Sequence, residues 1–184
     1  MTNSGSTVRD RLQQAAVELF LKNGFDDTTA AQIADRAGVT ERTFFRHFRD
    51  KREVLFDGQA VLADALTKSI ADAPPGTEPL DLLFRAFGSV TQLIEANRPF
   101  SKPRQDVISA TPALQERELS KLAALTDILA AALRERGVPA AQATMAAHVG
   151  MAAFADATLS WLENEEPGLA DRLDQAEKAL RSLF

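Results

Sequence analysis

The chain has 184 residues, of which 45% are hydrophobic and 26% are charged. These proportions are typical of a folded globular protein, and they exclude a disordered chain and a membrane-embedded one. The length suits one large domain, or a small module joined to a larger one, and excludes a long multidomain machine. No cysteine is present, which excludes disulfide frameworks, thiolate zinc sites and cysteine nucleophiles.

The formal net charge of −5 argues against a nucleic-acid partner only if the charge is evenly spread. Residues 1–57 hold nine basic and nine acidic side chains, so all of the net negative charge lies downstream. Residues 40–52 carry five basic and two acidic side chains, with three phenylalanines among them. A solvated helix face and a small nucleic-acid-binding patch both fit these charges, and the spacing has to separate the two.

The first seven residues are polar, and we expect a disordered tail over residues 1–7. No apolar run of about eighteen residues occurs in the chain, so neither a signal peptide nor a spanning helix is predicted. The expected location is therefore the cytoplasm, with no membrane partner.

The first predicted helix runs from Val8 to Asn23. Its apolar stripe consists of Val8, Leu12, Ala15, Ala16, Leu19 and Phe20. Gly24 supplies the left-handed residue that commonly ends a helix, and Phe25 is expected to fold back onto the stripe.

Two shorter helices follow. Thr28 or Thr29 caps the first of them, Gly38 ends it, and Thr40 caps the second. In that second helix, Phe44 and Phe48 share the buried face, while Arg42, Arg46 and Arg49 lie on the opposite side. The turn over residues 37–40 has the length that a helix-turn-helix uses.

Residue type and spacing over residues 8 to 55 resemble the DNA-binding region of the tetracycline-repressor (TetR) family of bacterial transcription regulators. The residues that carry this resemblance are Gly24-Phe25, Thr28-Thr29, Ile33-Ala34, Ala37-Gly38-Val39-Thr40, Thr43 to Phe48 and Lys51. The resemblance implies an all-α fold of about nine helices. It also implies a helix-turn-helix DNA-binding domain over residues 8–52 and an effector-binding and dimerisation domain over residues 53–184.

In such a protein the third helix enters the major groove, so Thr40, Glu41, Arg42 and Thr43 are placed for contact with base edges. Arg42 could bind a guanine through two hydrogen bonds, and Thr43 could touch a thymine methyl group. Glu41 either accepts a hydrogen bond from cytosine or stabilises the positive end of its own helix. The helix-end role is favoured.

The remaining contacts implied by the resemblance are to the DNA backbone. They involve Thr29, Phe45, Arg46, His47 and Lys51, and helix packing is the alternative for His47. Phe45 stands where the family usually has tyrosine, so the phosphate contact of the tyrosine hydroxyl cannot form, although the ring can still pack against the DNA backbone. Arg46 is long enough to replace that contact or to reach a base. Thr29 fits both a backbone contact and a plain N-cap. A catalytic role for His47 is rejected because no second histidine lies near it in the sequence.

Proline-marked breaks divide the rest into predicted helices over residues 51–72, 79–97, 102–110, 113–136, 140–164 and 169–183. The family resemblance places an effector pocket among the central helices, and seven residues are candidates for its lining. These are Phe84, Phe87, Phe100, Met145, His148, Met151 and Phe154. Ordinary core packing is the alternative for each of them.

A stripe of small residues, Ala146, Gly150, Ala153 and Ala157, would let another helix approach the 140–164 helix closely. Apolar residues continue to the end of the chain at Leu159, Trp161, Leu162, Leu169, Leu173, Ala176, Leu180 and Phe184. We expect a subunit interface of a twofold homodimer here, and internal packing is the alternative.

The function implied by the resemblance is that of a transcriptional repressor. It would bind a palindromic double-stranded DNA operator as a dimer and be released by a small apolar or amphipathic effector. The alternative is a helical small-molecule carrier or adaptor with no DNA role. The sequence has no glycine-rich phosphate loop, no His-Glu-x-x-His and no Gly-x-Ser-x-Gly. We therefore expect no enzymatic activity, no metal site and no cofactor.

Overall fold

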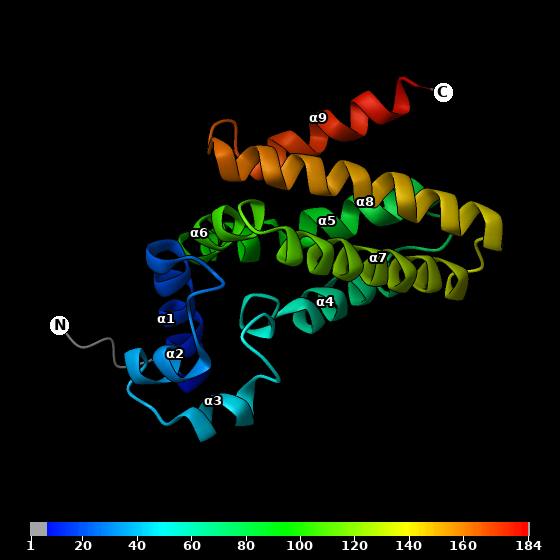
Figure 1. Ribbon diagram of the computed structural model, residues 1–184. Coiled ribbons are helices and arrows are strands. Elements are labelled where there is room, and N and C mark those ends of the chain that lie inside the picture. Colours follow the sequence, from blue (N-terminus) through cyan, green and yellow to red (C-terminus); the bar gives the residue numbers. More distant parts are fainter. Residues whose placement is uncertain (1–6, 184) are drawn as a thin grey trace. The chain divides into compact units, whose positions relative to one another are not determined.

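The computed structural model describes residues 7–183, and those residues form nine α-helices and one short 3-10 helix, with no strand among them (Figure 1). The predicted all-α class is thereby confirmed. The helices are α1 (Val8–Asn23), α2 (Ala30–Arg36), α3 (Glu41–His47), η1 (Glu53–Leu55), α4 (Gln59–Ala71), α5 (Pro79–Ala96), α6 (Arg98–Ser109), α7 (Pro112–Glu135), α8 (Ala140–Glu163) and α9 (Leu169–Arg181). None of the helices in this part of the chain is long and apolar enough to cross a membrane.

The chain divides into two compact units, each with its own hydrophobic core. The head unit comprises the described residues up to Asp57 together with Pro99–Glu118. The body unit comprises Gly58–Arg98 and the described residues from Leu119 onward. We had expected a domain division after residue 52, and sequence analysis did not anticipate that residues 99–118 pack with the helix-turn-helix.

Helix α1 forms where its apolar stripe was predicted and buries Leu12, Ala16 and Phe20. The Thr7 side chain accepts a hydrogen bond from the Asp10 amide and Asp10 bonds back to the Thr7 amide, a reciprocal cap. Thr7 therefore belongs to the ordered start of α1 and not to a disordered tail. The rest of the predicted tail, residues 1–6, lies outside the described residues.

Phe25 folds back onto α1, as predicted, with its ring centroid 5.1 Å from that of Phe20. Three buried residues from α6 and the start of α7 join this core, namely Val107, Ile108 and Leu114. The head unit therefore contains more than the three-helix module seen in the sequence.

Two predicted helix boundaries are wrong. The helix expected over residues 51–72 is interrupted, because Gly58 adopts a left-handed conformation with φ 90° between η1 and α4. Helix α6 begins at Arg98 and not at residue 102. Pro99 falls in its first turn, where the missing amide hydrogen costs no helical hydrogen bond.

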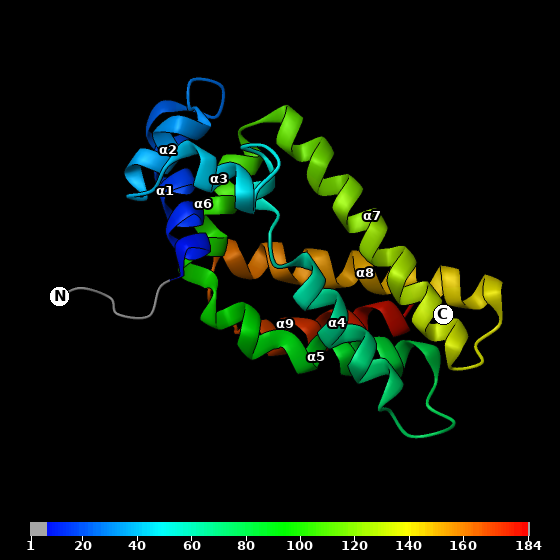
Figure 2. The ribbon, with the colours of Figure 1, turned by 90° about the horizontal axis from the view of Figure 1, so that it is seen from below.

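The body unit is built around α5, which packs against α4, α8 and α9. Figures 1 and 2 both show α9 lying along α8. The small-residue stripe of α8 faces this interior: a Cβ added at Gly150 would lie 2.9 Å from Leu83 Cδ1 of α5. The predicted close approach is thus made by α5 of the same chain, and the assignment of this stripe to a subunit interface is wrong.

A valine at position 150 is therefore expected to lower the free energy of unfolding of the body unit by about 1–3 kcal/mol, the usual cost of overpacking. Leu83 and Phe87, which a Cβ at position 150 would approach to 2.9 and 3.5 Å, are both fully buried. Gly88→Val is the matched control, because a Cβ at Gly88 of α5 meets nothing within 4 Å. Denaturant titrations that find the two variants equally stable would contradict this prediction.

Two connections in the body unit are closed by arginine side chains. Arg136 donates to the carbonyl oxygens of Ala71, Ala73 and Pro74 between α4 and α5, at 2.8–3.0 Å. Arg172 donates in the same way to the carbonyl oxygens of Asn164, Glu166 and Pro167 between α8 and α9. Each guanidinium satisfies carbonyl groups that no helical amide reaches.

Candidate nucleic-acid interface

The two helices of the predicted helix-turn-helix meet at Gly38, which has φ 70° and ends α2. The Val39 amide donates to the Ala34 carbonyl oxygen at 2.9 Å, and this bond turns the chain sharply toward α3. Thr40 then caps α3: its side-chain oxygen accepts from the Thr43 amide at 3.2 Å. The local caps and the single left-handed glycine thereby fix where α3 begins.

The buried face of α3 is aromatic. Phe44 is fully buried and Phe48, just beyond the helix, is 3% exposed, as predicted. Their ring centroids lie 5.7 Å apart. With this face inside, the side chains of Glu41, Arg42, Phe45 and Arg46 are held on the solvent side.

The exposed arginines at α3 stand apart from every other arginine of the described head unit. Within the part of the chain that the structure describes, Arg42, Arg46 and Arg49 make no hydrogen bond or ion pair. The remaining arginines are all engaged: Arg9 with Asp57, Arg11 with the Ala37 carbonyl, Arg36 with Glu18, Arg52 with Asp50, Arg104 with Glu118 and Arg117 with Glu53. All of the head unit's arginines that lack a partner among the described residues therefore lie on α3 or within two residues of its end.

Arg49 belongs to this group, although sequence analysis did not name it as a site residue. The signal was present in the three-residue and four-residue spacing of residues 42, 46 and 49. A cluster of unpaired, exposed guanidinium groups beside an exposed phenylalanine can bind phosphate oxygens and base edges. Phe45, 52% exposed, supplies that ring.

Thr29 caps α2, which settles the choice between Thr28 and Thr29. Its hydroxyl oxygen accepts from the Gln32 amide at 3.2 Å, and the Gln32 side chain accepts from the Thr29 amide at 2.8 Å. The hydroxyl hydrogen of Thr29 is not used by this cap and can still be donated to a phosphate. The two roles considered for Thr29 are thus chemically compatible.

Lys51 lies after α3, and its ammonium group is already occupied. The Nζ atom donates to the carbonyl oxygens of Phe25 at 2.7 Å, Asp26 at 3.1 Å and Thr28 at 2.9 Å. An ammonium has three hydrogens to donate, so these contacts use all of them. The geometry does not favour the phosphate contact that the resemblance implied for this lysine.

His47 is half-buried at the end of α3, and its Nε2 atom is buried without a hydrogen-bond partner among the described residues. No group of His, Cys, Asp or Glu side chains in those residues could hold a metal ion. The His47 ring lies beside that of Phe48, with ring centroids 6.4 Å apart, as a packing role requires.

Comparisons with known proteins agree with this arrangement. The sequence model described as "Bacterial regulatory proteins, tetR family" matches residues 12–57, and the model described as "MftR C-terminal domain" matches residues 77–184. The chain belongs to the TetR family of bacterial transcription regulators.

Relatives of this TetR-family chain span several bacteria. It is 40% identical over 82 residues to the transcriptional regulator TcmR of Streptomyces glaucescens, covering 45% of this chain and 36% of that protein. It is 24% identical over 178 residues to MftR of Mycobacterium tuberculosis, a regulator assigned to mycofactocin biosynthesis, covering 93% and 88%. The chain thus spans about a third of TcmR but most of MftR.

Among solved structures, the TetR-family repressor FadR of Thermus thermophilus in complex with lauroyl-CoA is similar. Its TM-score is 0.55 and its sequence identity is 27%, with 94% of this chain and 93% of that chain covered. The likeness therefore extends through both units of the TetR-family chain and is not confined to the helix-turn-helix.

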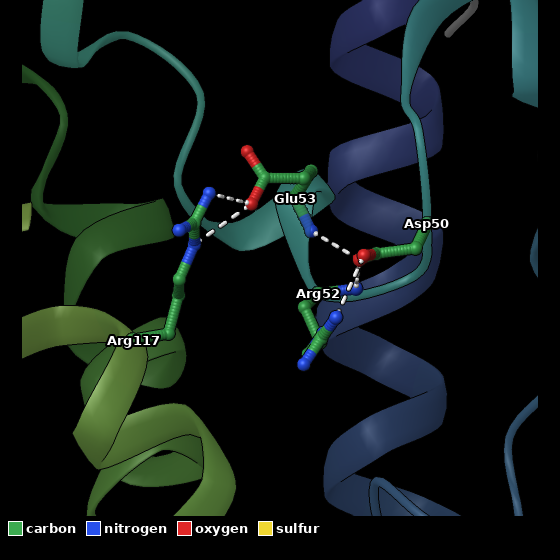
Figure 3. A network of polar contacts seen from close by, with 4 residues as sticks. All are labelled: Asp50, Arg52, Glu53 and Arg117. Carbon is green, nitrogen blue, oxygen red and sulfur yellow. Dashed lines mark hydrogen bonds and ion pairs between the residues drawn. The ribbon is translucent and has the colours of Figure 1, made fainter. Parts of the chain in front are cut away.

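A polar network connects the segment after α3 to α7 within the head unit of this TetR-family protein (Figure 3). Asp50 Oδ1 accepts from the amides of Arg52 and Glu53 at 2.8 and 3.1 Å, which caps η1 and not the long helix expected from residue 51. Arg117 of α7 donates from Nε to Glu53 Oε1 at 2.9 Å. The end of the helix-turn-helix is therefore tied to α7 through η1.

Asp50 is expected to make the stability of the head unit depend on pH. Partial burial acts to raise the pKa of Asp50, but hydrogen bonds from the Arg52 side chain and from the amides of Glu53 and Arg52, with the Arg52 charge, outweigh it and lower the pKa. A carboxyl group with a lowered pKa contributes stability above its unfolded pKa of about 4 and loses it as the pH falls through the folded pKa.

Asp50→Asn retains a capping oxygen but loses the charge. The free energy of unfolding of the wild type should exceed that of this variant by a constant amount above about pH 5. The difference should shrink as the pH falls below about 4, in denaturant titrations at several pH values. A difference that grew on acidification would contradict the assigned sign.

Four of the seven residues proposed for an effector pocket come together in the core of the body unit. Phe87 stacks on Phe154 with centroids 4.5 Å apart, Phe84 meets Phe87 edge-on at 5.8 Å, and Met151 is buried in the same core. Close ring stacking of this kind is typical of plain core packing. Their assignment to a pocket stays a prediction.

The other three are placed differently from what we expected. Met145 is 70% exposed on α8, and His148, one turn further along, is also exposed with its Nδ1 atom 2.8 Å from the Thr144 carbonyl oxygen. Phe100 packs against the core of the head unit. The sequence pattern predicted that each of these residues lies on a helix, but not which core, or solvent, its side chain faces.

Proposed function

We propose that this TetR-family chain represses transcription by binding a palindromic operator as a homodimer, and that a small effector releases it. The observation that supports the DNA part is the group of exposed arginines on and just after α3, which make no hydrogen bond or ion pair within the described residues. The other arginines of the described head unit are engaged in ion pairs or hydrogen bonds. An unpaired cluster gains most from a polyanionic partner, because binding phosphate breaks no internal ion pair.

In this proposal the N-terminal turn of α3 lies in the major groove, where Arg42 reads a base edge and Thr43 contacts a neighbouring base. Thr40 positions the Thr43 side chain, since its hydroxyl group lies 3.0 Å from that of Thr43. Arg46, Arg49 and the Thr29 hydroxyl serve the phosphates. Glu41 stabilises the positive end of α3 from its first turn.

The dimer part of the proposal is supported by the outer face of α8. Met145 is 70% exposed and Leu159 is 44% exposed, and the small residue Ala152 and His148 lie exposed between them. A twofold copy of this face would cover these apolar side chains, and two identical heads would then read the two halves of a palindrome. Leu159→Glu should convert the dimer to a monomer in sedimentation experiments; an unchanged dimer would place the interface elsewhere.

The effector part is supported by similarity to FadR, whose structure holds lauroyl-CoA. By that likeness we propose an apolar or amphipathic effector bound in the body unit near Phe84 and Met151. Release follows if the effector prefers a conformation that does not fit the operator, because its differential affinity sets the size of the shift. In this proposal the regulator acts on genomic DNA in the bacterial cytoplasm and carries out no catalytic step.

The DNA proposal is tested by selecting sequences from a random DNA library with the full-length chain. The selected DNA should contain an inverted repeat. Its affinity should fall steeply when the salt concentration is raised from 50 to 200 mM, roughly as six or more phosphate contacts require. Failure to enrich any sequence, or an affinity insensitive to salt, would favour the carrier or adaptor function instead.

The effector proposal can be tested with the single tryptophan, Trp161, which is buried in the core of the body unit. Lauroyl-CoA is titrated while the Trp161 fluorescence and the operator complex are followed together. Binding that changes the fluorescence and dissociates the DNA supports release by an acyl-type effector. Binding with no loss of the DNA complex would contradict it.

A further inference from the structure

The carbonyl groups that Lys51 contacts lie in the connection between α1 and α2. This connection carries Thr28, which is completely buried. Its hydroxyl group donates to the carbonyl oxygens of Leu19 and Gly24 at 3.3 and 2.8 Å. Thr28 is thus fixed to the end of α1 through its side chain and to Lys51 through its carbonyl oxygen.

The bond from Lys51 to Thr28 joins two points 23 residues apart in the sequence. Thr28 immediately precedes Thr29, the cap of α2, and Lys51 follows α3. The bond therefore connects the residue before the helix-turn-helix to the segment after it. The Nζ atom also lies 4.3 Å from the centroid of the Phe25 ring, an attractive cation–π contact.

We propose that Lys51 supports DNA binding as a positioning residue that closes the helix-turn-helix, and not as a phosphate ligand. It fixes the position of the start of α2, and of the Thr29 hydroxyl there, relative to α3 and its arginines. To bind a phosphate, its ammonium would have to give up carbonyl contacts on which that position depends. The inference rests on the proposed DNA-binding function.

Two substitutions separate the two roles. Lys51→Met keeps the apolar stem and removes the charge and all three donors. Lys51→Arg keeps the charge, but a flat guanidinium cannot aim three hydrogens at three converging carbonyl oxygens as an ammonium does. If Lys51 binds phosphate, arginine should replace it. If Lys51 acts through its three bonds to backbone carbonyl oxygens, arginine should not replace it.

The experiment measures the affinity of full-length wild type and both variants for the selected operator across a series of salt concentrations. Amide hydrogen exchange at the start of α2 is recorded without DNA. We expect both variants to bind about 10-fold or more weakly and to exchange these amides about 10-fold faster. The slope of log affinity against log salt should change by less than about 0.4, under half of the ~0.9 that one phosphate contact contributes.

Arg46→Met is the matched comparison, because it removes one charge from the exposed face of α3. For this variant the slope of log affinity against log salt is expected to fall in magnitude by about 0.9, while amide hydrogen exchange at the start of α2 stays unchanged. The proposal is overturned if Lys51→Met shows that same pattern, or if Lys51→Arg binds and exchanges like the wild type. If Lys51→Met does not fold, Lys51→Arg alone decides between the two roles.

A wild type that forms no specific DNA complex would refute the proposed function. In that event the exchange measurement would still show whether Lys51 closes the helix-turn-helix. DNA binding by the wild type thus tests the proposed function, and amide exchange tests the role of Lys51 separately.

Discussion

Replacing Phe44 by alanine is expected to lower the free energy of unfolding of the head unit by about 3–5 kcal/mol. The side chain is fully buried, and its ring contacts those of Phe45 and Phe48 with centroids 5.3 and 5.7 Å away. Its removal leaves a cavity that the short helix α3, with only seven residues, cannot close by itself. The operator complex should be lost together with the fold of the head unit.

Phe45→Ala is the matched control, since it removes the same ring from the neighbouring position. Phe45 is 52% exposed, so its loss should change the stability by no more than about 0.5–1 kcal/mol. Chemical denaturation followed by circular dichroism measures both variants. Equal destabilisation by the two substitutions would mean that the inward and outward faces of α3 have been assigned incorrectly.

The orientation of α3 could be predicted because its determinants are local. A threonine cap, a left-handed glycine and two aromatic residues four apart fix where the helix begins and which side is buried. Each of these features can be read within about ten residues of sequence. The arginines on the opposite face follow without further information.

The composition of the head core could not be predicted in the same way. Val107, Ile108 and Leu114 read as apolar positions of helices, but nothing in their spacing identifies the core that they join. The small-residue stripe of α8 illustrates the same limit. Gly150 correctly indicates a close helix approach, yet whether the approaching helix is α5 or a second copy depends on tertiary packing.

Lys51 shows a third limit of sequence-based prediction, because the sequence does not tell toward which acceptor atoms a side chain points. A lysine after α3 fits a phosphate site and a site of backbone carbonyl groups equally well, because both supply oxygen acceptors. The choice depends on where the carbonyl groups of residues 25–28 point, and that is set by the turn between α1 and α2. By contrast, the break before α4 had a readable signal, since Asp57-Gly58 is a typical turn pair.

Arg42→Ala is expected to reduce the affinity for the operator by roughly 5- to 150-fold, the range that 1–3 kcal/mol of base discrimination represents. Arg42 lies in the first turn of α3, exposed and unpaired among the described residues, so the free protein loses no internal contact. The stability of the head unit should therefore stay within about 0.5 kcal/mol of the wild type. The loss must then arise in the complex.

Arg42→Lys separates base reading from charge. The lysine keeps the positive charge near the phosphates, so binding to random DNA should be retained while the preference for the selected operator falls. Arg85→Ala is the control and should bind like the wild type, because Arg85 of α5 in the body unit is exposed and has no partner among residues 7–183. Competition titrations with operator and scrambled DNA measure the preference directly. If alanine and lysine at position 42 weakened binding to both DNAs equally, Arg42 would be a backbone contact, and base reading would have to be assigned to Thr43 or Arg46.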